Sequence, residues 1–211
     1  HYEIQKSSWV WHPDCLQRGQ SSVVIFKCNF EIAEKIKIKI HVSADNRYEL
    51  SLDGKLISRG PHHCDEFHWS FSSYEKKKKK GAHEFNAVCH WLNEEGPVAQ
   101  RTIGHGGFIF AVEGSLSETL NTGIGKWVVA KWEGWSFERN PLEKKAYCAV
   151  GQQFVMNSEA MQQPKIWVSP KNITNPLKDS NTGLIRPKWK LFPTSIPELM
   201  YEPRAIGKLR G

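Results

Sequence analysis

Side chains that could bind a metal ion are most concentrated in one short segment, which contains His62, His63, Cys64, Asp65 and His68. Imidazole and thiolate groups are preferred ligands of zinc, and four ligands could be taken from this set. Adjacent residues of an extended chain point to opposite sides, however, and no second ligand pair follows at the spacing of a zinc finger. We therefore expect a polar loop leading into a strand, with no metal and no other cofactor.

A run of five lysines, Lys76–Lys80, ends at Gly81. Such a concentration of positive charge attracts phosphate backbones or acidic glycans. A nucleic-acid site normally adds interleaved aromatic residues or a known module pattern, and neither accompanies this run. We expect a solvated turn between two strands and no nucleic-acid partner.

No residue pattern marks a catalytic nucleophile or a phosphate-binding loop. The G-x-S-x-G turn of serine hydrolases and the Walker loop are both absent from the sequence. A glycosidase needs two carboxyl groups that flank the scissile bond, whereas the adjacent Asp65 and Glu66 would face opposite ways on a strand. We therefore expect no catalytic residue here, although glutamates on different strands could still meet in space.

Nine tryptophans are many for 211 residues, and we expect two or three of them to be exposed. An exposed indole stacks on the apolar face of a sugar ring, while arginine and histidine hydrogen-bond to sugar hydroxyls. The candidate carbohydrate-binding residues are Arg59, His68 and Trp69, with Trp91 as a neighbour. In the alternative interpretation, Trp69 fills the core and Arg59 pairs with a carboxylate.

The candidate residues are expected to be positioned by β-strands, because hydrophobic side chains in this sequence repeat with a period of two, the pattern of a strand with one buried face. In the segment 35–42, isoleucines alternate with lysines, which places Ile36, Ile38, Ile40 and Val42 against a core. Asp53-Gly54 separates alternating runs at 48–52 and 55–59, the strongest short signal for a hairpin. Further strands are expected at 22–32, 66–74, 84–92, 107–113, 126–132, 145–155 and 165–169. With no long amphipathic helix, the pattern predicts an all-β fold, an antiparallel β-sandwich.

The amino-acid composition is typical of a protein with a substantial hydrophobic core. Apolar residues make up 39% of the chain, and the formal net charge is +7. No apolar run approaches the roughly eighteen residues that span a bilayer, so no membrane partner is expected. The five cysteines are widely spaced without a C-x-x-C pair, which favours free, partly buried thiols.

The chain changes character near its end, where prolines, asparagines and serines recur from Pro164 onward. Each residue before a proline is biased away from helix. We expect residues 1–170 to form the β-sandwich. Residues 171–211 should form an extended, proline-rich strap that leads toward a further domain.

Several motifs resemble those of the N-terminal β-sandwich module of bacterial α-L-rhamnosidases, the enzymes of glycoside hydrolase family 78. The motifs extend over nearly the whole chain, and the resemblance depends on the order in which they follow one another. They are Trp9-Val-Trp11 with Pro13, Ser43-Ala-Asp-Asn-Arg-Tyr48, Arg59-Gly60-Pro61, His68-Trp69, Val88-Cys-His-Trp-Leu-Asn93, Gly106-Gly-Phe108, Leu120-Asn-Thr-Gly123, Lys126-Trp127, Val150-Gly151 and Trp189-Lys-Leu191.

The resemblance implies a jelly-roll, galactose-binding-like sandwich, with the catalytic acid and base in a separate (α/α)6 barrel. It implies a non-catalytic accessory domain that packs on the catalytic domain of the same polypeptide and contacts rhamnose-containing glycans. Three other functions stay open at this point. The first is a stand-alone carbohydrate-binding module, and the second is a self-contained glycosidase. The third is a basic protein that binds nucleic acid or glycosaminoglycan.

Overall fold

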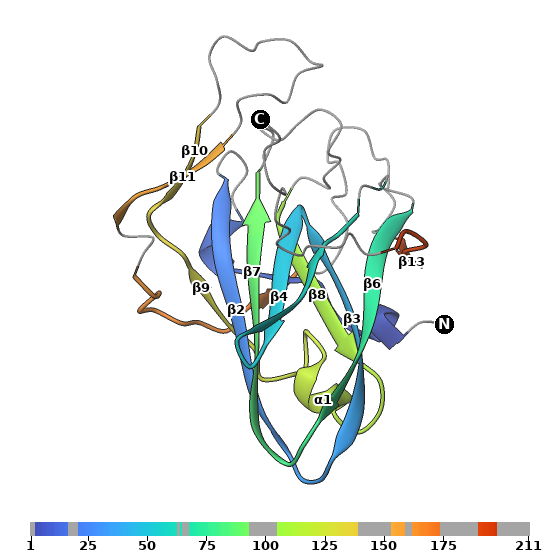
Figure 1. Cartoon of the computed structure of the whole chain (residues 1–211). Helices are drawn as coiled ribbons and strands as arrows, with labels where there is room; N and C mark the ends of the chain where they lie inside the picture. Colours follow the sequence, from blue (N-terminus) through green and yellow to red (C-terminus); the bar gives the residue numbers. More distant parts are fainter. Residues whose placement is uncertain are drawn as a thin grey trace, which may run out of the picture.

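The computed structural model describes residues 3–16, 21–62, 64, 68–92, 105–138, 153–158, 162–173 and 190–197. Within these ranges the chain is built mainly of strands, and two sheets face each other across a core (Figure 1). The predicted all-β, antiparallel β-sandwich is thus confirmed.

The first sheet has six strands in the order β12-β1-β8-β3-β6-β13. Their bounds are Lys171–Asn172 for β12, Val10–Trp11 for β1, Gly107–Val112 for β8, Ile36–Asp45 for β3, Trp69–Lys78 for β6 and Leu191–Pro193 for β13. Neighbouring strands are antiparallel except β13, which runs parallel to β6.

The second sheet has five antiparallel strands in the order β5-β4-β7-β2-β9. Their bounds are Lys55–Gly60 for β5, Arg47–Leu52 for β4, Gly81–Trp91 for β7, Ser22–Ile32 for β2 and Val128–Lys131 for β9. A separate hairpin joins β10 (Trp135–Glu138) to β11 (Gln153–Met156). The helical pieces of the described chain are short: η1 (Glu3–Lys6), η2 (Pro13–Cys15) and α1 (Ser117–Leu120).

Buried and outward-facing side chains alternate along the first part of β3, as the sequence predicts. Ile38, Ile40 and Val42 are buried between the sheets, and Ile36 is half-buried. The hairpin prediction is also confirmed, since Asp53 and Gly54 have φ values of 52° and 72° between β4 and β5. Positive φ at both positions suits the tight turn of a two-residue hairpin.

Aromatic side chains dominate the core between the sheets. Phe26 of β2 stacks on Phe108 of β8 with ring centroids 4.7 Å apart, and Phe85 of β7 lies 4.9 Å from Phe110. Trp127 contacts Phe110 at 5.1 Å. Aromatic rings from both sheets therefore pack in one cluster, and this packing holds the two sheets in their relative position.

A second, smaller core covers the outer face of the first sheet. Ile4 of η1, Trp9, Trp69 and Leu191 of β13 are all buried there. Because β12 and β13 are strands of the first sheet, the sheet extends past the predicted boundary at residue 170. Residues 174–189 and 198–211 lie outside the described chain, and a strap leading to a further domain stays a prediction.

Other expectations have mixed outcomes. The lysine run was expected to be a turn, but Lys76–Lys78 belong to β6, and only Lys79 and Lys80 connect this strand to β7 of the other sheet. Of the strand expected at 165–169 only an isolated bridge between Val168 and Val129 forms, and most of 145–155 lies outside the described residues. Four cysteines are free as expected, and Cys148 lies outside the described chain.

Candidate functional site

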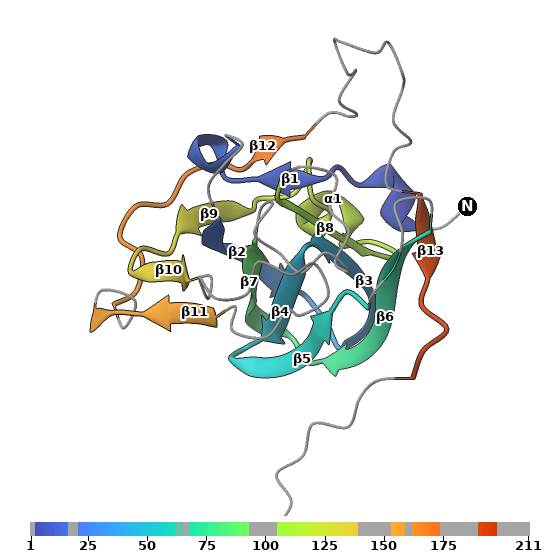
Figure 2. The same ribbon diagram turned by 90° about the horizontal axis from the view of Figure 1, so that it is seen from above.

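A groove of about 730 Å³ lies over the outer face of the second sheet, near the ends of β4, β5 and β7. Arg47 and Glu49 of β4 and Val88 and His90 of β7 form its floor, while the neighbouring Leu50 and Cys89 belong to the core. The whole of the segment from Leu56 to His62 lines one side. Trp132 and Trp135, at the turn between β9 and β10, line it as well. Figure 2 shows the β10–β11 hairpin beside this sheet, with β5 beyond β4.

The polar side chains of the floor are placed by strand register. Arg47 of β4 pairs with His90 of β7, and Glu49 pairs with Arg59 on one side and Val88 on the other. Directly opposite residues of neighbouring strands share a face. The Arg59 Nε donates a hydrogen bond of 2.7 Å to Oε2 of Glu49.

The two indoles form one wall of aromatic surface. Trp132 and Trp135 are both half-buried, with ring centroids 5.6 Å apart and planes at 73°. Gly134 between them has a φ of 83°, which an L side chain rarely adopts, and so permits this turn. Trp135 also lies 6.1 Å from the His90 ring, so aromatic wall and polar floor adjoin.

Burial and a nearby charge act on the protonation of His90. Burial, followed by the nearby Arg47 charge, lowers the pKa of His90. The imidazole is therefore neutral at pH 7 and offers one donor and one acceptor nitrogen. Neutral imidazole, guanidinium groups and indole faces together can hydrogen-bond hydroxyls and stack on a ring.

The structure brings only one of the four predicted sugar-binding residues to this groove. Arg59 lines it and pairs with Glu49, whereas exposed His68 lies against Phe192 of β13 with ring centroids 5.1 Å apart. Trp69 is 2% exposed in the second core, and Trp91 is fully buried in the main core. Neither indole presents a face to solvent, so the alternative in which Trp69 fills the core describes it correctly.

Sequence reasoning missed Arg47, His90, Trp132 and Trp135 as members of one site. Trp132-Glu-Gly-Trp135 combines two tryptophans with a glycine turn, and that local signal could have marked an exposed aromatic pair. Nothing local connects this turn to β4 and β7, because their proximity depends on the order of strands in the sheet.

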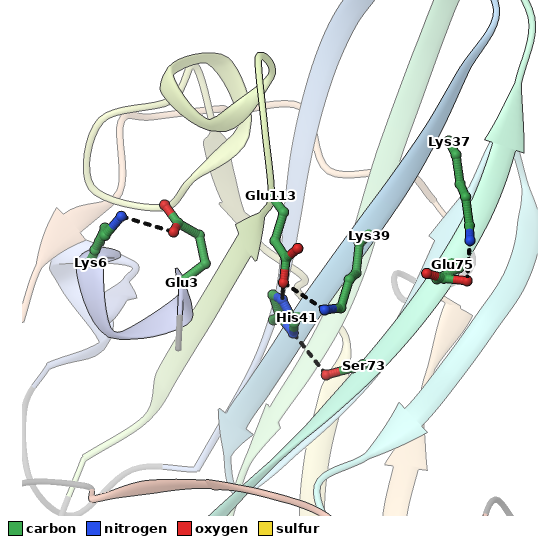
Figure 3. Close-up of polar contacts among 8 residues, drawn as sticks. All are labelled: Glu3, Lys6, Lys37, Lys39, His41, Ser73, Glu75 and Glu113. Atoms are coloured by element: carbon green, nitrogen blue, oxygen red, sulfur yellow. Dashed lines mark hydrogen bonds and ion pairs between the residues drawn. The ribbon is translucent and has the colours of Figure 1, made fainter. Parts of the chain in front are cut away.

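A second polar cluster lies on the outer face of the first sheet (Figure 3). His41 is 5% exposed and has both ring nitrogens occupied, with Nδ1 2.8 Å from Oγ of Ser73 and Nε2 3.0 Å from Oε1 of Glu113. Lys39 Nζ lies 2.7 Å from the same Glu113 oxygen. Hydrogen bonds from Lys39 and then His41 lower the pKa of Glu113, so its carboxylate accepts a hydrogen bond from Nε2–H of His41. These contacts satisfy a buried imidazole and leave the carboxylate neutralised by Lys39.

Among the described residues, no group of three or more histidine, cysteine or acidic side chains is placed to hold a metal ion, and His63 and Asp65 of the predicted cluster fall outside these residues. In the same part of the chain no helix has both the length and the apolar character to cross a membrane.

No model of a known protein family matches the sequence, and no curated protein matches it. Among solved structures, the family-78 rhamnosidase of Bacillus sp. GL1 matches 90% of this chain with a TM-score of 0.65 and 19% identity. The α-L-rhamnosidase of Aspergillus terreus matches 83% with a TM-score of 0.51 and 12% identity. The chain spans about a fifth of the length of each enzyme. The predicted likeness to a β-sandwich part of family-78 rhamnosidases is confirmed at the level of the fold.

Proposed function

We propose that this chain is a non-catalytic accessory domain of an α-L-rhamnosidase-like glycoside hydrolase and binds carbohydrate in the groove over its second sheet. The observation that carries the sugar-binding part is the half-buried pair Trp132 and Trp135 beside the polar floor. The shared fold with part of two rhamnosidases supports the accessory role.

The groove has the properties of a saccharide site. Its volume falls within the range of about 300 to 1,000 Å³ that is usual for small-molecule sites. Indoles supply apolar faces for the C–H side of a sugar ring, and Arg59, Glu49 and His90 supply hydrogen-bonding groups for hydroxyls. Sugars that contain rhamnose are the ligands that the resemblance implies.

The second part of the proposal concerns the partner. A chain that spans about a fifth of its structural neighbours fits a domain that packs on the catalytic barrel of the same polypeptide. In that arrangement the barrel supplies the catalytic acid and base.

Calorimetric titration with rhamnose and with rhamnose-containing oligosaccharides tests sugar binding. We expect measurable heat at millimolar sugar and a loss of about tenfold in affinity for Trp135→Ala, equivalent to about 1.4 kcal/mol of lost stacking. Trp167→Ala is the matched control, because Trp167 is also half-buried but does not line the groove. Its ring is covered by Lys27, whose Nζ lies 4.9 Å from the ring centroid. Circular dichroism confirms that both variants remain folded.

Two outcomes would contradict sugar binding in the groove. The first is an absence of heat and of chemical-shift change at millimolar sugar. The second is equal loss of affinity in the Trp135 and Trp167 variants, which would point to a global effect instead of a contact with the ligand.

A further inference from the structure

Two turns lie side by side at one end of the sandwich, and lysines surround both of them. The first turn joins β2 to β3, and the second joins β6 to β7. Strand register brings the turns together, because Ile32 pairs with Gly81 and Ile36 pairs with Lys78. Figure 1 shows this end of the sandwich pointing away from the β10–β11 hairpin. No lysine of these turns lines the groove over the second sheet, so the two surfaces can be altered separately.

Positive charge exceeds negative charge around the two turns. Residues 33–37 and 75–81 contain seven lysines and two glutamates. Glu75 binds Lys37 at 2.7 Å, and Glu34 is the other carboxylate of these segments. Four exposed lysines make no ion pair with any residue that the structure describes, and we call them the lysine tip: Lys35, Lys77, Lys79 and Lys80.

The register of β3 and β6 separates a balanced part of the first sheet from this unbalanced end. Lys39 stands opposite Glu75 and also binds Glu113 at 2.7 Å (Figure 3). Two residues nearer the turns, Lys37 stands opposite Lys77. Like charges directly opposite on neighbouring strands destabilise a sheet. Because Glu75 neutralises Lys37, the charge of Lys77 remains available to an anion from outside the domain.

We propose that the lysine tip binds an acidic glycan, a polysaccharide that carries a carboxylate or sulfate on successive sugars. The inference goes beyond the proposed function, since it assigns a second binding surface and does not require a sugar in the groove. Neighbouring cations attract a linear polyanion, and an ammonium group acts as a point charge that suits either kind of anion.

Nucleic acid shares the anionic chemistry, but the composition of the turns favours the glycan. Residues 33–35 and 79–82 contain no aromatic side chain on which a base could stack. They contain no arginine either, and arginine is the residue whose planar group binds phosphate through two parallel hydrogen bonds. A flexible chain of charged sugars requires neither feature.

Calorimetric titration with hexagalacturonate, with its fully methyl-esterified form and with a heparin hexasaccharide tests the proposal. The ester shares the sugar rings of hexagalacturonate but lacks its charges. At about 0.05 M salt we expect the ester to bind at least about fivefold more weakly than the acids, and this difference to shrink as salt rises to about 0.5 M. The acid that binds more tightly identifies carboxylate or sulfate as the preferred group.

Paired substitutions test the location of the site. Lys77→Gln combined with Lys79→Gln should weaken binding of the acids by about fivefold or more, because two exposed charge pairs are lost. Lys77→Arg combined with Lys79→Arg should keep the affinity, since both charges remain. Lys165→Gln combined with Lys171→Gln is the matched control, because it removes two exposed lysines and β12, which contains Lys171, is separated from β6 by three strands. Circular dichroism verifies that every variant is folded.

Four results would overturn the proposal. The first is failure of both acids to bind at low salt. The second is equal weakening in the two double-glutamine variants, which would show an effect of net charge instead of a site. The third is equal affinity for acid and ester that is lost in Trp135→Ala, which would place the ligand in the groove and leave the proposed carbohydrate binding standing. The fourth is a DNA duplex of equal charge that binds more tightly than both acids and loses this affinity in the Lys77→Gln, Lys79→Gln variant, which would assign the surface to nucleic acid.

The opposite combination separates this inference from the proposed function. If the acids bind at the lysine tip while the rhamnose oligosaccharides fail to bind, sugar binding in the groove is overturned and the inference stands.

Discussion

Lys78 and Asp53 tie the two sheets together at one end of the sandwich. Lys78 Nζ, from β6 of the first sheet, lies 2.5 Å from Oδ2 of Asp53, in the β4–β5 turn of the second sheet. Asp53 also accepts hydrogen bonds from Nδ1 of His83 at 2.8 Å and from the backbone N–H of Glu84 at 3.0 Å. Partial burial alone would raise the pKa of Asp53, but the contacts with Lys78, His83 and Glu84 lower it to about 2.

Replacing Asp53 by asparagine is expected to lower the free energy of unfolding by about 1 to 2 kcal/mol at pH 7, since a charged acceptor shared by several donors is lost. The folded-state pKa lies below the ordinary value of 3.8, so this stabilisation is present above about pH 4 and disappears as the pH falls toward about 2. Burial alone would lower the pKa of His83, but its hydrogen bond to Asp53 raises it. The stabilisation that protonated His83 contributes through this contact is therefore fully present below pH 6.5. It is lost as the pH rises through the raised pKa of His83 in the folded protein.

Urea unfolding of both proteins across this pH range measures the effect. Glu75→Gln is the control, because it breaks the exposed Lys37–Glu75 pair on the outer face of one sheet and should change stability by less than about 1 kcal/mol. If Asp53→Asn and the parent protein show the same pH profile, the contact between the sheets does not contribute to stability.

Ile38→Asp is expected to destabilise the fold by at least about 3 kcal/mol. The side chain of Ile38 is 1% exposed in the core, and an aspartate there is either an unpaired charge or a carboxyl with a strongly raised pKa. Lys35→Asp places the same new side chain at an exposed position just before β3 and should change stability by about 0.5 kcal/mol or less. Equal melting temperatures for the two variants would mean that the inward face of β3 has been misassigned.

Leu191→Ala tests whether the chain beyond residue 170 contributes to the sandwich. Leu191 is 6% exposed against the second core, where its neighbour in register is Trp69, so its truncation should cost about 2 kcal/mol or more. Ile196→Ala, in the same segment but with 52% of the side chain exposed, should have almost no effect. Chemical denaturation distinguishes them, and indistinguishable curves would show that β13 does not stabilise the domain.

Local chemistry explains which parts of the structure were predictable. The alternating segment around Ile38 and the Asp53-Gly54 turn each carry their signal within a few residues, and both form as expected. The candidate site does not have such a signal. Arg59 and Trp69 are close in sequence, yet β5 and β6 belong to different sheets, and burial separates their side chains. Trp135 reaches the groove only because β10 lies beside β2 and β7, an arrangement set by long-range packing.

The isolated chain is expected not to hydrolyse an aryl α-L-rhamnoside. Retaining and inverting glycosidases place two carboxyl groups roughly 5 to 9.5 Å apart across the sugar. Of the described residues that line the groove, only Glu49 carries a carboxyl group, and Arg59 holds it through a 2.7 Å hydrogen bond that keeps it from acting freely as an acid or base. Incubation of the purified chain with the substrate, beside Glu49→Gln, measures any turnover. Activity above background that disappears in Glu49→Gln would overturn this expectation, because it would mean that a second carboxyl group completes the site and that the chain is a glycosidase by itself.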